Sequence, residues 1–291
     1  MPLLRSASLH FTGAALLLAT ATAAAQSWAW DDGTVPFVVT PDEVVERMLR
    51  IAEVGPGDQL IDLGSGDGRI VIRAAQKYGA RGTGIEIDPS LIARSLANAR
   101  AAGVADRVDF RAQDLFDADL SGASVITMYL LPEFNLKLRP RLLKLAPGTR
   151  IVSHDWDMGD WQADETQELR VPEKSTGRDG RSRISLWLVP ADARGRWVSE
   201  MGEHGGRWAF SIKQQYQQLE VDAVVQGRGL VVRGTRLRGR EIKLAITGAV
   251  GGRGWNHLFR GLIDGDTLRG EVLVSDGDKS RRIVWTARRQ P

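Results

Sequence analysis

The residues best suited to chemistry form a glycine-rich turn between a short apolar run and a helical pattern. The run covers residues 60–63, and Gly64, Gly66 and Gly68 follow it directly. Apolar residues then recur at helical spacing over residues 70–78. A strand, a glycine turn and a helix in this order place free backbone N–H groups where a polar cofactor can approach without Cβ clashes. The turn therefore predicts a cofactor-binding site.

The spacing of the glycines separates two kinds of cofactor. A dinucleotide-binding turn needs a third glycine at position 69, where this chain has Arg69, and the glycine stands at Gly68 instead. The next expected strand, residues 83–87, carries Glu86, which comes 22 positions after Gly64. This offset is close to the roughly 20 residues expected for an acid that accepts hydrogen bonds from ribose hydroxyls. The pattern indicates a cofactor that contains a ribose but is not a dinucleotide.

A second candidate acid follows the third expected strand. Residues 107–111 form that strand, and Asp114 and Leu115 come just after it. Each of the three features also has an ordinary structural explanation: a tight turn for the glycines, a solvated strand end for Glu86 and a loop acid for Asp114. All three features occur at the ends of successive expected strands, and this joint occurrence favours the hypothesis of a cofactor-binding site.

Alternating strands and helices position these residues. Thr40, Pro41 and Glu43 form the pattern of a capping box, which predicts a helix starting at Pro41. Further helices are expected from Asp88 to Gly103 and over residues 136–145. Strands are expected over residues 124–132 and 149–154, and residues 160–189 should form a hairpin or an edge strand. This alternation predicts an α/β fold with a doubly wound, Rossmann-like sheet.

The period of the apolar residues changes to two after Pro190. Turn signals at residues 238–240, 264–266 and 276–278 separate the runs, so we expect a small antiparallel all-β domain of six to eight strands, barrel-like or a sandwich. From Ala191 onward the chain has 18 Lys and Arg against 11 Asp and Glu. The basic cluster over residues 228–243 could meet an anionic polymer or a membrane surface. The alternative is a solvated exterior, which the lack of interleaved aromatic residues favours.

The first 25 residues have the features of a secretory signal peptide. Arg5 precedes an apolar segment, and Ala23 to Ala25 offer a cleavage site before Gln26. We therefore expect three parts: a leader over residues 1–25, an α/β domain over 26–190 and a basic β domain over 191–291. The mature protein should be exported or periplasmic, with membrane association as the alternative. The sequence has no cysteine and four scattered histidines, so we expect no structural metal.

The motifs resemble a known family. The pattern Asp62-x-Gly64-x-Gly66-x-Gly68 is similar to the first motif of class I S-adenosylmethionine-dependent methyltransferases. Together with residues 36–41 and 129–132, it resembles the small protein-lysine methyltransferases. That family includes the mitochondrial enzymes that modify the ATP synthase c-subunit and the adenine nucleotide translocase. The likeness covers residues 35–189 and none of the β domain.

The resemblance implies a methyltransferase that uses S-adenosylmethionine and has a protein lysine as the plausible acceptor. The cofactor-binding residues that it implies are Asp62, Gly64, Ser65, Gly66, Gly68, Glu86, Asp114 and Leu115. Tyr129 and Glu133, after the fourth strand, would orient or polarise the incoming amine, with ordinary packing as the alternative. The D/N-P-P-Y motif of enzymes that methylate nucleobase or glutamine nitrogens is missing there. A different hypothesis is an exported binding protein that keeps the fold as a scaffold and recognises its ligand through the basic β domain.

Overall fold

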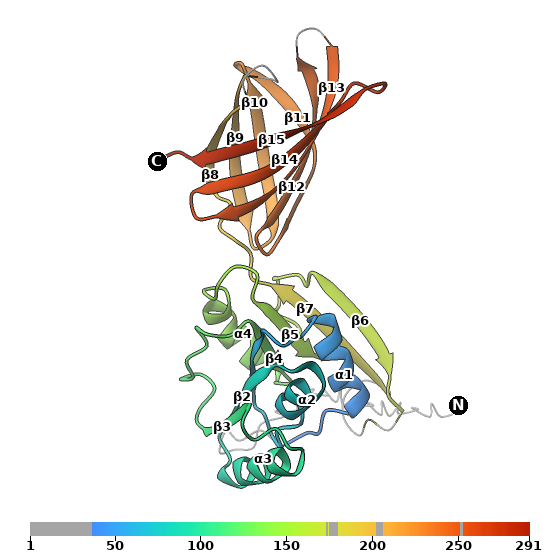
Figure 1. The fold of residues 1–291 in the computed structure, drawn as a ribbon, viewed down its shortest axis with the longest axis vertical. Coiled ribbons are helices and arrows are strands. Elements are labelled where there is room, and N and C mark those ends of the chain that lie inside the picture. The colour runs from blue at the N-terminus through green and yellow to red at the C-terminus, as the bar shows by residue number, and fades with distance from the viewer. Residues whose placement is uncertain (1–36, 173, 175–179, 202–205, 251–252) are drawn as a thin grey trace, which may run out of the picture. The chain divides into compact units, whose positions relative to one another are not determined.

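A computed structural model describes residues 37–172, 174, 180–201, 206–250 and 253–291. The expected leader, residues 1–25, lies outside the described residues. The described chain forms an α/β domain with a mixed sheet, followed by a closed barrel of antiparallel strands (Figure 1). Both parts agree with the fold class predicted from the sequence.

The α/β part contains a seven-stranded sheet in the order β3-β2-β1-β4-β5-β7-β6. The first five strands in the sequence run parallel, whereas β7 is antiparallel to β5 and β6 is antiparallel to β7. The order reverses between β1 and β4, which makes the carboxyl ends of these two strands the topological switch point. The strands are β1 (Gln59–Leu63), β2 (Arg81–Glu86), β3 (Val108–Ala112), β4 (Val125–Met128), β5 (Arg150–His154), β6 (Glu165–Arg170) and β7 (Arg181–Leu188).

Helices cover both faces of this sheet (Figure 1). The helices are α1 (Asp42–Ile51), α2 (Arg69–Tyr78), α3 (Pro89–Ala101) and α4 (Pro132–Leu142). Val45 of α1 and Val71 of α2 join one buried cluster with Val152 of β5. Leu138 of α4 joins a second cluster on the opposite face with Ile126 of β4. Alternate residues of a strand point to opposite faces, and β1, β4, β5 and β7 contribute to both clusters.

Two local predictions about helix starts are wrong. Thr40 does not cap α1, because Pro41 occupies the N-cap position and no side chain caps the helix; the Thr40 carbonyl oxygen instead accepts a hydrogen bond from Arg69 Nη1 at 3.0 Å. The fourth strand ends at Met128, and α4 begins at Pro132 and not at residue 136. Proline is favoured in the first helical turn because its missing N–H would have no partner there.

The barrel contains eight strands, and β15 pairs with β8 to close it. These strands are β8 (Gly195–Glu200), β9 (Arg207–Gln215), β10 (Gln218–Val225), β11 (Arg228–Arg238), β12 (Glu241–Val250), β13 (Arg253–Asp264), β14 (Thr267–Ser275) and β15 (Ser280–Arg289). Its interior is filled by a cluster of aromatic side chains that includes Trp208, Phe259 and Trp285. The three predicted turns separate β11 from β12, β13 from β14 and β14 from β15.

Candidate active site

The glycine turn joins the end of β1 to the start of α2 at the switch point. Gly64, Gly66 and Gly68 all have positive φ values, of 73°, 54° and 78°, which residues other than glycine rarely adopt. A Cβ on Gly66 would also lie 2.1 Å from Cε2 of Phe37. The turn therefore requires glycine for its backbone path and for the ring that lies against it, and the segment before α1 lies over the turn.

Two side chains of α3 hold the turn from the other direction. Ser95 is fully buried, and its hydroxyl donates to the Gly66 carbonyl oxygen at 2.9 Å. The Asn98 side chain donates to the Asp67 carbonyl oxygen at 2.9 Å. Sequence reasoning missed both residues, because polar positions on an amphipathic helix normally face solvent. Their hydrogen bonds fix the carbonyl groups of the turn.

Glu86, the last residue of β2, is held by three backbone N–H groups. Its Oε2 accepts from Gly66 at 2.9 Å, and its Oε1 accepts from Ile87 at 2.8 Å and from Asp88 at 3.1 Å. This places the predicted ribose-binding carboxylate directly beside the glycine turn. A carboxylate has about four acceptor positions, so Glu86 keeps about one of them for a ligand hydroxyl.

Asp62 lies below the turn, buried in β1. Its Oδ1 accepts a hydrogen bond from the Thr127 hydroxyl at 2.7 Å, and the residue is only 2% exposed. Burial raises the pKa of Asp62 to about 7, and the negative charges of Glu86 and Asp67 add to this effect, while the Thr127 hydrogen bond opposes it. This hydrogen bond links β1 to β4, the two strands at the switch point.

The remaining predicted cofactor residues lie along the same edge. The Ser65 side chain is buried and points inward, within 2.5 Å of where a Cβ of Gly84 would be. Asp114 is exposed and its Oδ1 accepts from the Phe116 N–H at 2.8 Å, while Leu115 is half-buried. The Gln113 N–H binds the Glu86 carbonyl oxygen at 2.9 Å, which brings the loop after β3 beside the end of β2.

The two predicted catalytic residues occupy different environments. Tyr129 follows β4 and is half-buried, with its ring centroid 4.0 Å from that of His154. Its hydroxyl donates to Asp155 Oδ2 at 3.2 Å. Glu133 is exposed in the first turn of α4. Of the two, Tyr129 stands at the carboxyl edge next to the glycine turn.

His154, at the end of β5, is a neutral side chain buried beside Tyr129. Its Nε2 lies 2.8 Å from the Ser182 hydroxyl oxygen. Burial lowers the pKa of His154 to about 4, an effect that Asp155 opposes and Lys174 reinforces. The imidazole therefore supports the Tyr129 ring without carrying a charge at neutral pH. Farther along this segment, Trp161 is 1% exposed and packs in the core against Trp187.

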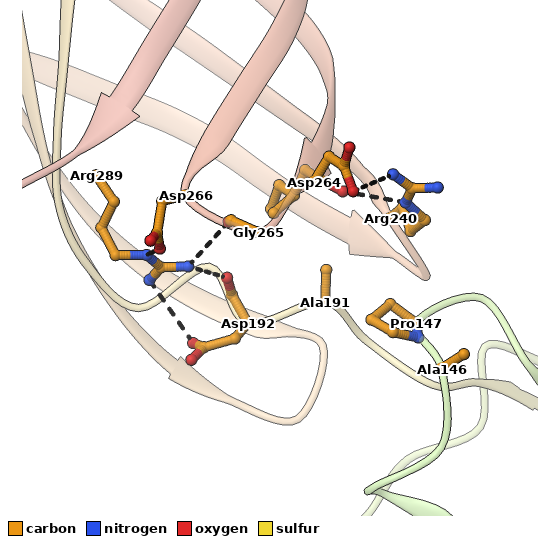
Figure 2. A pocket seen from close by; sticks show the side chains of 10 residues that line it. Ala146, Pro147, Ala191, Asp192, Arg240, Asp264, Gly265, Asp266 and Arg289 are labelled. Atoms are coloured by element: carbon orange, nitrogen blue, oxygen red, sulfur yellow. Dashed lines mark hydrogen bonds and ion pairs between the residues drawn. The ribbon is translucent and has the colours of Figure 1, made fainter. Parts of the chain in front are cut away.

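Hollows on the described surface are candidate routes of approach to the site. One, of about 760 Å³, is lined by Glu168, Arg170, Pro172, Gly180, Arg181, Ser182 and Arg183, and Ser182 connects it to His154. Another, of about 650 Å³, contains Arg240 and Arg289 (Figure 2). Both of these guanidinium groups are paired, with Asp264 at 2.9 Å and Asp266 at 2.8 Å, so their charges are already balanced. Because Ser182 contacts His154 beside Tyr129, the first hollow is the better candidate for an approach to the site.

Neither a metal site nor a membrane-spanning helix is found in the part of the chain that the structure describes. No group of three or more His, Asp or Glu side chains there could hold a metal ion. Of the described helices, none is both long and apolar enough to cross a membrane.

The donors and acceptors at this edge fit S-adenosylmethionine. Glycines without Cβ atoms, a fixed carboxylate at the end of β2 and an acid after β3 are arranged along three adjacent strands. Combined with the sheet order, this arrangement defines a class I S-adenosylmethionine-dependent methyltransferase.

Comparison with known proteins identifies the family within this class. The family model for the ANTKMT methyltransferase domain matches residues 62–165. A protein-lysine N-methyltransferase of Saccharolobus islandicus is 44% identical over 133 residues, which are 45% of this chain and 83% of the relative. The Mus musculus lysine N-methyltransferase of the ATP synthase c-subunit is 34% identical, over 65% of this chain and 75% of the relative. The chain belongs to this methyltransferase family.

A solved structure provides a further comparison. It is described as an RNA methyltransferase from Salinibacter ruber in complex with S-adenosyl-L-homocysteine, and it is 53% identical over 53% of this chain and 95% of the other, with a TM-score of 0.49.

Proposed function

We propose that the chain transfers a methyl group from S-adenosylmethionine to the ε-amine of a lysine in a protein substrate. Relatives of which this chain covers 83% and 75% are named as lysine methyltransferases. The observation that carries the proposal is the position of Tyr129. Its hydroxyl donates to the buried carboxylate of Asp155. Enzymes that methylate nucleobase or glutamine nitrogens have the D/N-P-P-Y motif at this point of the chain. A carboxylate favours a cationic acceptor over a nucleobase.

The residues of the chain have mainly a positioning role. S-adenosylmethionine supplies an activated methyl group on its sulfonium. Gly66 and Glu86 hold the nucleoside side of the site, whereas Tyr129 and Asp155 lie on the acceptor side. Methyl transfer needs an aligned acceptor with a free electron pair, and Asp155 Oδ2 is a carboxylate atom that can hold the proton that the amine loses.

The first experiment measures cofactor binding by calorimetry and compares Gly66→Val with the unaltered chain. The new side chain would meet Phe37 and force a residue with a branched Cβ into positive φ, so S-adenosylmethionine binding should be lost while the fold is kept. Gly103→Ala is the matched control, because Gly103 has a φ of 70° and no atom within 4 Å of the added Cβ. Equal affinity of the Gly66→Val variant and the unaltered chain would contradict the assignment.

The second experiment identifies the acceptor class. The chain is incubated with S-adenosylmethionine that carries a labelled methyl group, together with either a protein extract or total RNA. Label on lysine residues of the protein fraction is expected. Label that appears only in RNA would favour the acceptor named for the Salinibacter protein.

We also propose that the protein is exported and that its leader is removed near Ala25. The support is the arrangement of Arg5, the apolar segment and the three alanines. Mass spectrometry of protein from the native cell should find Gln26 as the first residue. Recovery of an intact Met1 from the cytosol would contradict export.

A further inference from the structure

Lys174 is a buried lysine at the acceptor side of the site. Its side chain is only 3% exposed, and that of Asp155 is 7% exposed. Lys174 Nζ donates to Asp155 Oδ2 and to the Arg181 carbonyl oxygen, the latter at 2.9 Å. Because lysine is almost never fully buried without a partner, this ammonium occupies a specific polar cradle.

The strand register places this cradle beside the glycine turn. Leu63 of β1 pairs with Met128 of β4, which pairs with Ser153 of β5. The next residues along these strands are Gly64, Tyr129 and His154, and neighbouring strands lie about 4.8 Å apart. Asp155 is one residue farther. The carboxylate therefore lies on the side of Tyr129 away from the cofactor turn.

Asp155 is held rigidly in an unusual backbone conformation. Its φ is 64°, a region that a residue with a side chain seldom adopts and that often marks functional sites. The Arg183 N–H donates to Asp155 Oδ1 at 3.0 Å, and the Asp155 N–H donates to the Arg183 carbonyl oxygen at 2.6 Å. These bonds leave Oδ2 directed at both the Tyr129 hydroxyl and the Lys174 ammonium.

The cradle has the polar groups that a primary alkylammonium requires. Asp155 supplies a negative charge, the Arg181 carbonyl supplies a second acceptor, and the Tyr129 hydroxyl donates to the same Asp155 carboxylate. The adjacent hollow is lined in part by Arg181 and Ser182, so it opens beside the same acceptor groups.

We propose that Asp155, together with Tyr129, is the binding subsite for the ammonium group of the acceptor lysine, and that Lys174 is an internal occupant which an incoming lysine side chain displaces. The proposal rests on the lysine acceptor proposed above and adds the residues that bind it. Asp155 sets the specificity for a cationic side chain, and Lys174 limits access to that site.

The test uses the full chain and thermal unfolding, with Nα-acetyl-lysine amide as the probe. Lys174→Ala empties the subsite and leaves Asp155 without its cation. A ligand that binds the native state raises the melting temperature of the protein. At a probe concentration about ten times the dissociation constant, the melting temperature of Lys174→Ala should rise by at least about 2 °C. The unaltered chain should show a much smaller rise. This readout remains informative if the variant is less stable, because binding then restores stability.

Three controls make the result specific. Lys174→Met keeps the volume of the side-chain stem and removes the charge, so it should block the probe. The double variant Lys174→Ala, Asp155→Asn should lose the rise, and a probe whose ε-amine is acetylated should give none in any variant. An equal rise in the unaltered chain and in Lys174→Ala, or no rise in Lys174→Ala, would overturn the proposal.

S-adenosylmethionine alone serves as the reference ligand in the same assay. If S-adenosylmethionine stabilises the chain but the probe fails to stabilise Lys174→Ala, the proposal of the acceptor subsite is wrong, whereas the assignment of cofactor binding is kept. If S-adenosylmethionine stabilises none of the variants, the proposed function itself fails.

Discussion

At the scale of single residues, the site depends on carboxyl groups with different surroundings. Glu86 is bound by three backbone N–H groups at the edge of the sheet, whereas Asp62 is buried below the turn with one hydroxyl partner. Desolvation pushes a buried carboxyl group such as that of Asp62 toward its neutral form. Of the two, Glu86 is the carboxylate placed beside the glycine turn to bind a ligand.

Glu86→Ala should weaken S-adenosylmethionine binding by about 2–3 kcal/mol, because hydrogen bonds to a charged acceptor are lost. Glu86→Gln keeps one acceptor oxygen and should lose less. Calorimetry measures both affinities, with the exposed Asp109→Ala as a control from the neighbouring strand. If both Glu86 variants bind as tightly as the parent, this side chain serves only the turn.

Asp62 should make the protein less stable as the pH rises. Its pKa is raised from 3.8 to about 7 in the folded state, so the native state binds the proton more tightly than the unfolded chain. The stability contributed by the neutral form is fully present below about pH 4 and is lost as the pH rises through 7, at up to about 1.4 kcal/mol per pH unit.

Asp62→Asn removes this dependence while keeping an acceptor for Thr127. The difference in unfolding free energy between Asp62→Asn and the parent should therefore grow in favour of the variant from pH 5 to pH 8. Denaturant unfolding at each pH measures it. The subtraction cancels the opposite effect of His154 and His257, whose lowered pKa values reduce stability as the pH falls from 6.5 toward 4. A constant difference would mean that Asp62 is ionised throughout.

At the scale of elements, α3 holds the cofactor turn in its conformation. Ser95→Ala removes the hydrogen bond to the Gly66 carbonyl oxygen and leaves that oxygen buried without this donor. A bond of this kind contributes about 1 kcal/mol, so the affinity for S-adenosylmethionine should fall about three- to tenfold. Ser90→Ala, at the exposed start of the same helix, is the control. Equal affinities of the two variants would show that the turn keeps its shape without α3.

At the scale of the whole molecule, the barrel presents a row of positive charges. Arg236, Lys243 and Arg260 are direct cross-strand neighbours on β11, β12 and β13, and like charges in such positions repel each other. Arg260 is also paired in register with Glu271 of β14, and Lys243 lies 3.0 Å from Glu241, so part of this charge is balanced. Binding experiments on this row can distinguish a contact with an anionic polymer or a membrane surface, the possibility raised from the sequence, from a solvated exterior.

Replacing Arg236 and Arg260 with Glu should weaken such a contact, and Arg260→Glu also places a like charge opposite Glu271 of β14. The effect is measured as binding to anionic phospholipid vesicles and to heparin, each at two salt concentrations. The free energy of binding to a membrane should become weaker by about 1 kcal/mol per removed charge. Arg194→Glu is the control, because Arg194 is paired with Asp192 at 2.8 Å. Vesicle and heparin binding that does not differ between the variants and the parent would favour the solvated exterior.

Patterns that are local in the chain were sufficient for the types of most elements. The glycine turn, the alternation of strands and helices, the terminal hairpin of the sheet and the turns of the barrel each depend on residues within about ten positions of one another. Backbone propensity and apolar period act over that range, so the sequence alone predicted both parts of the fold and the edge that carries the cofactor residues.

Contacts between distant segments were decided only by the tertiary structure. Phe37 lies against Gly66, Ser95 of α3 binds the Gly66 carbonyl, and Lys174 reaches Asp155 from beyond β6. None of these pairs has a periodic signal, because its partners meet only after the strands have paired. The sequence therefore determined which chemistry the carboxyl edge could perform. The path of the chain determined which buried carboxylate and which lysine meet there.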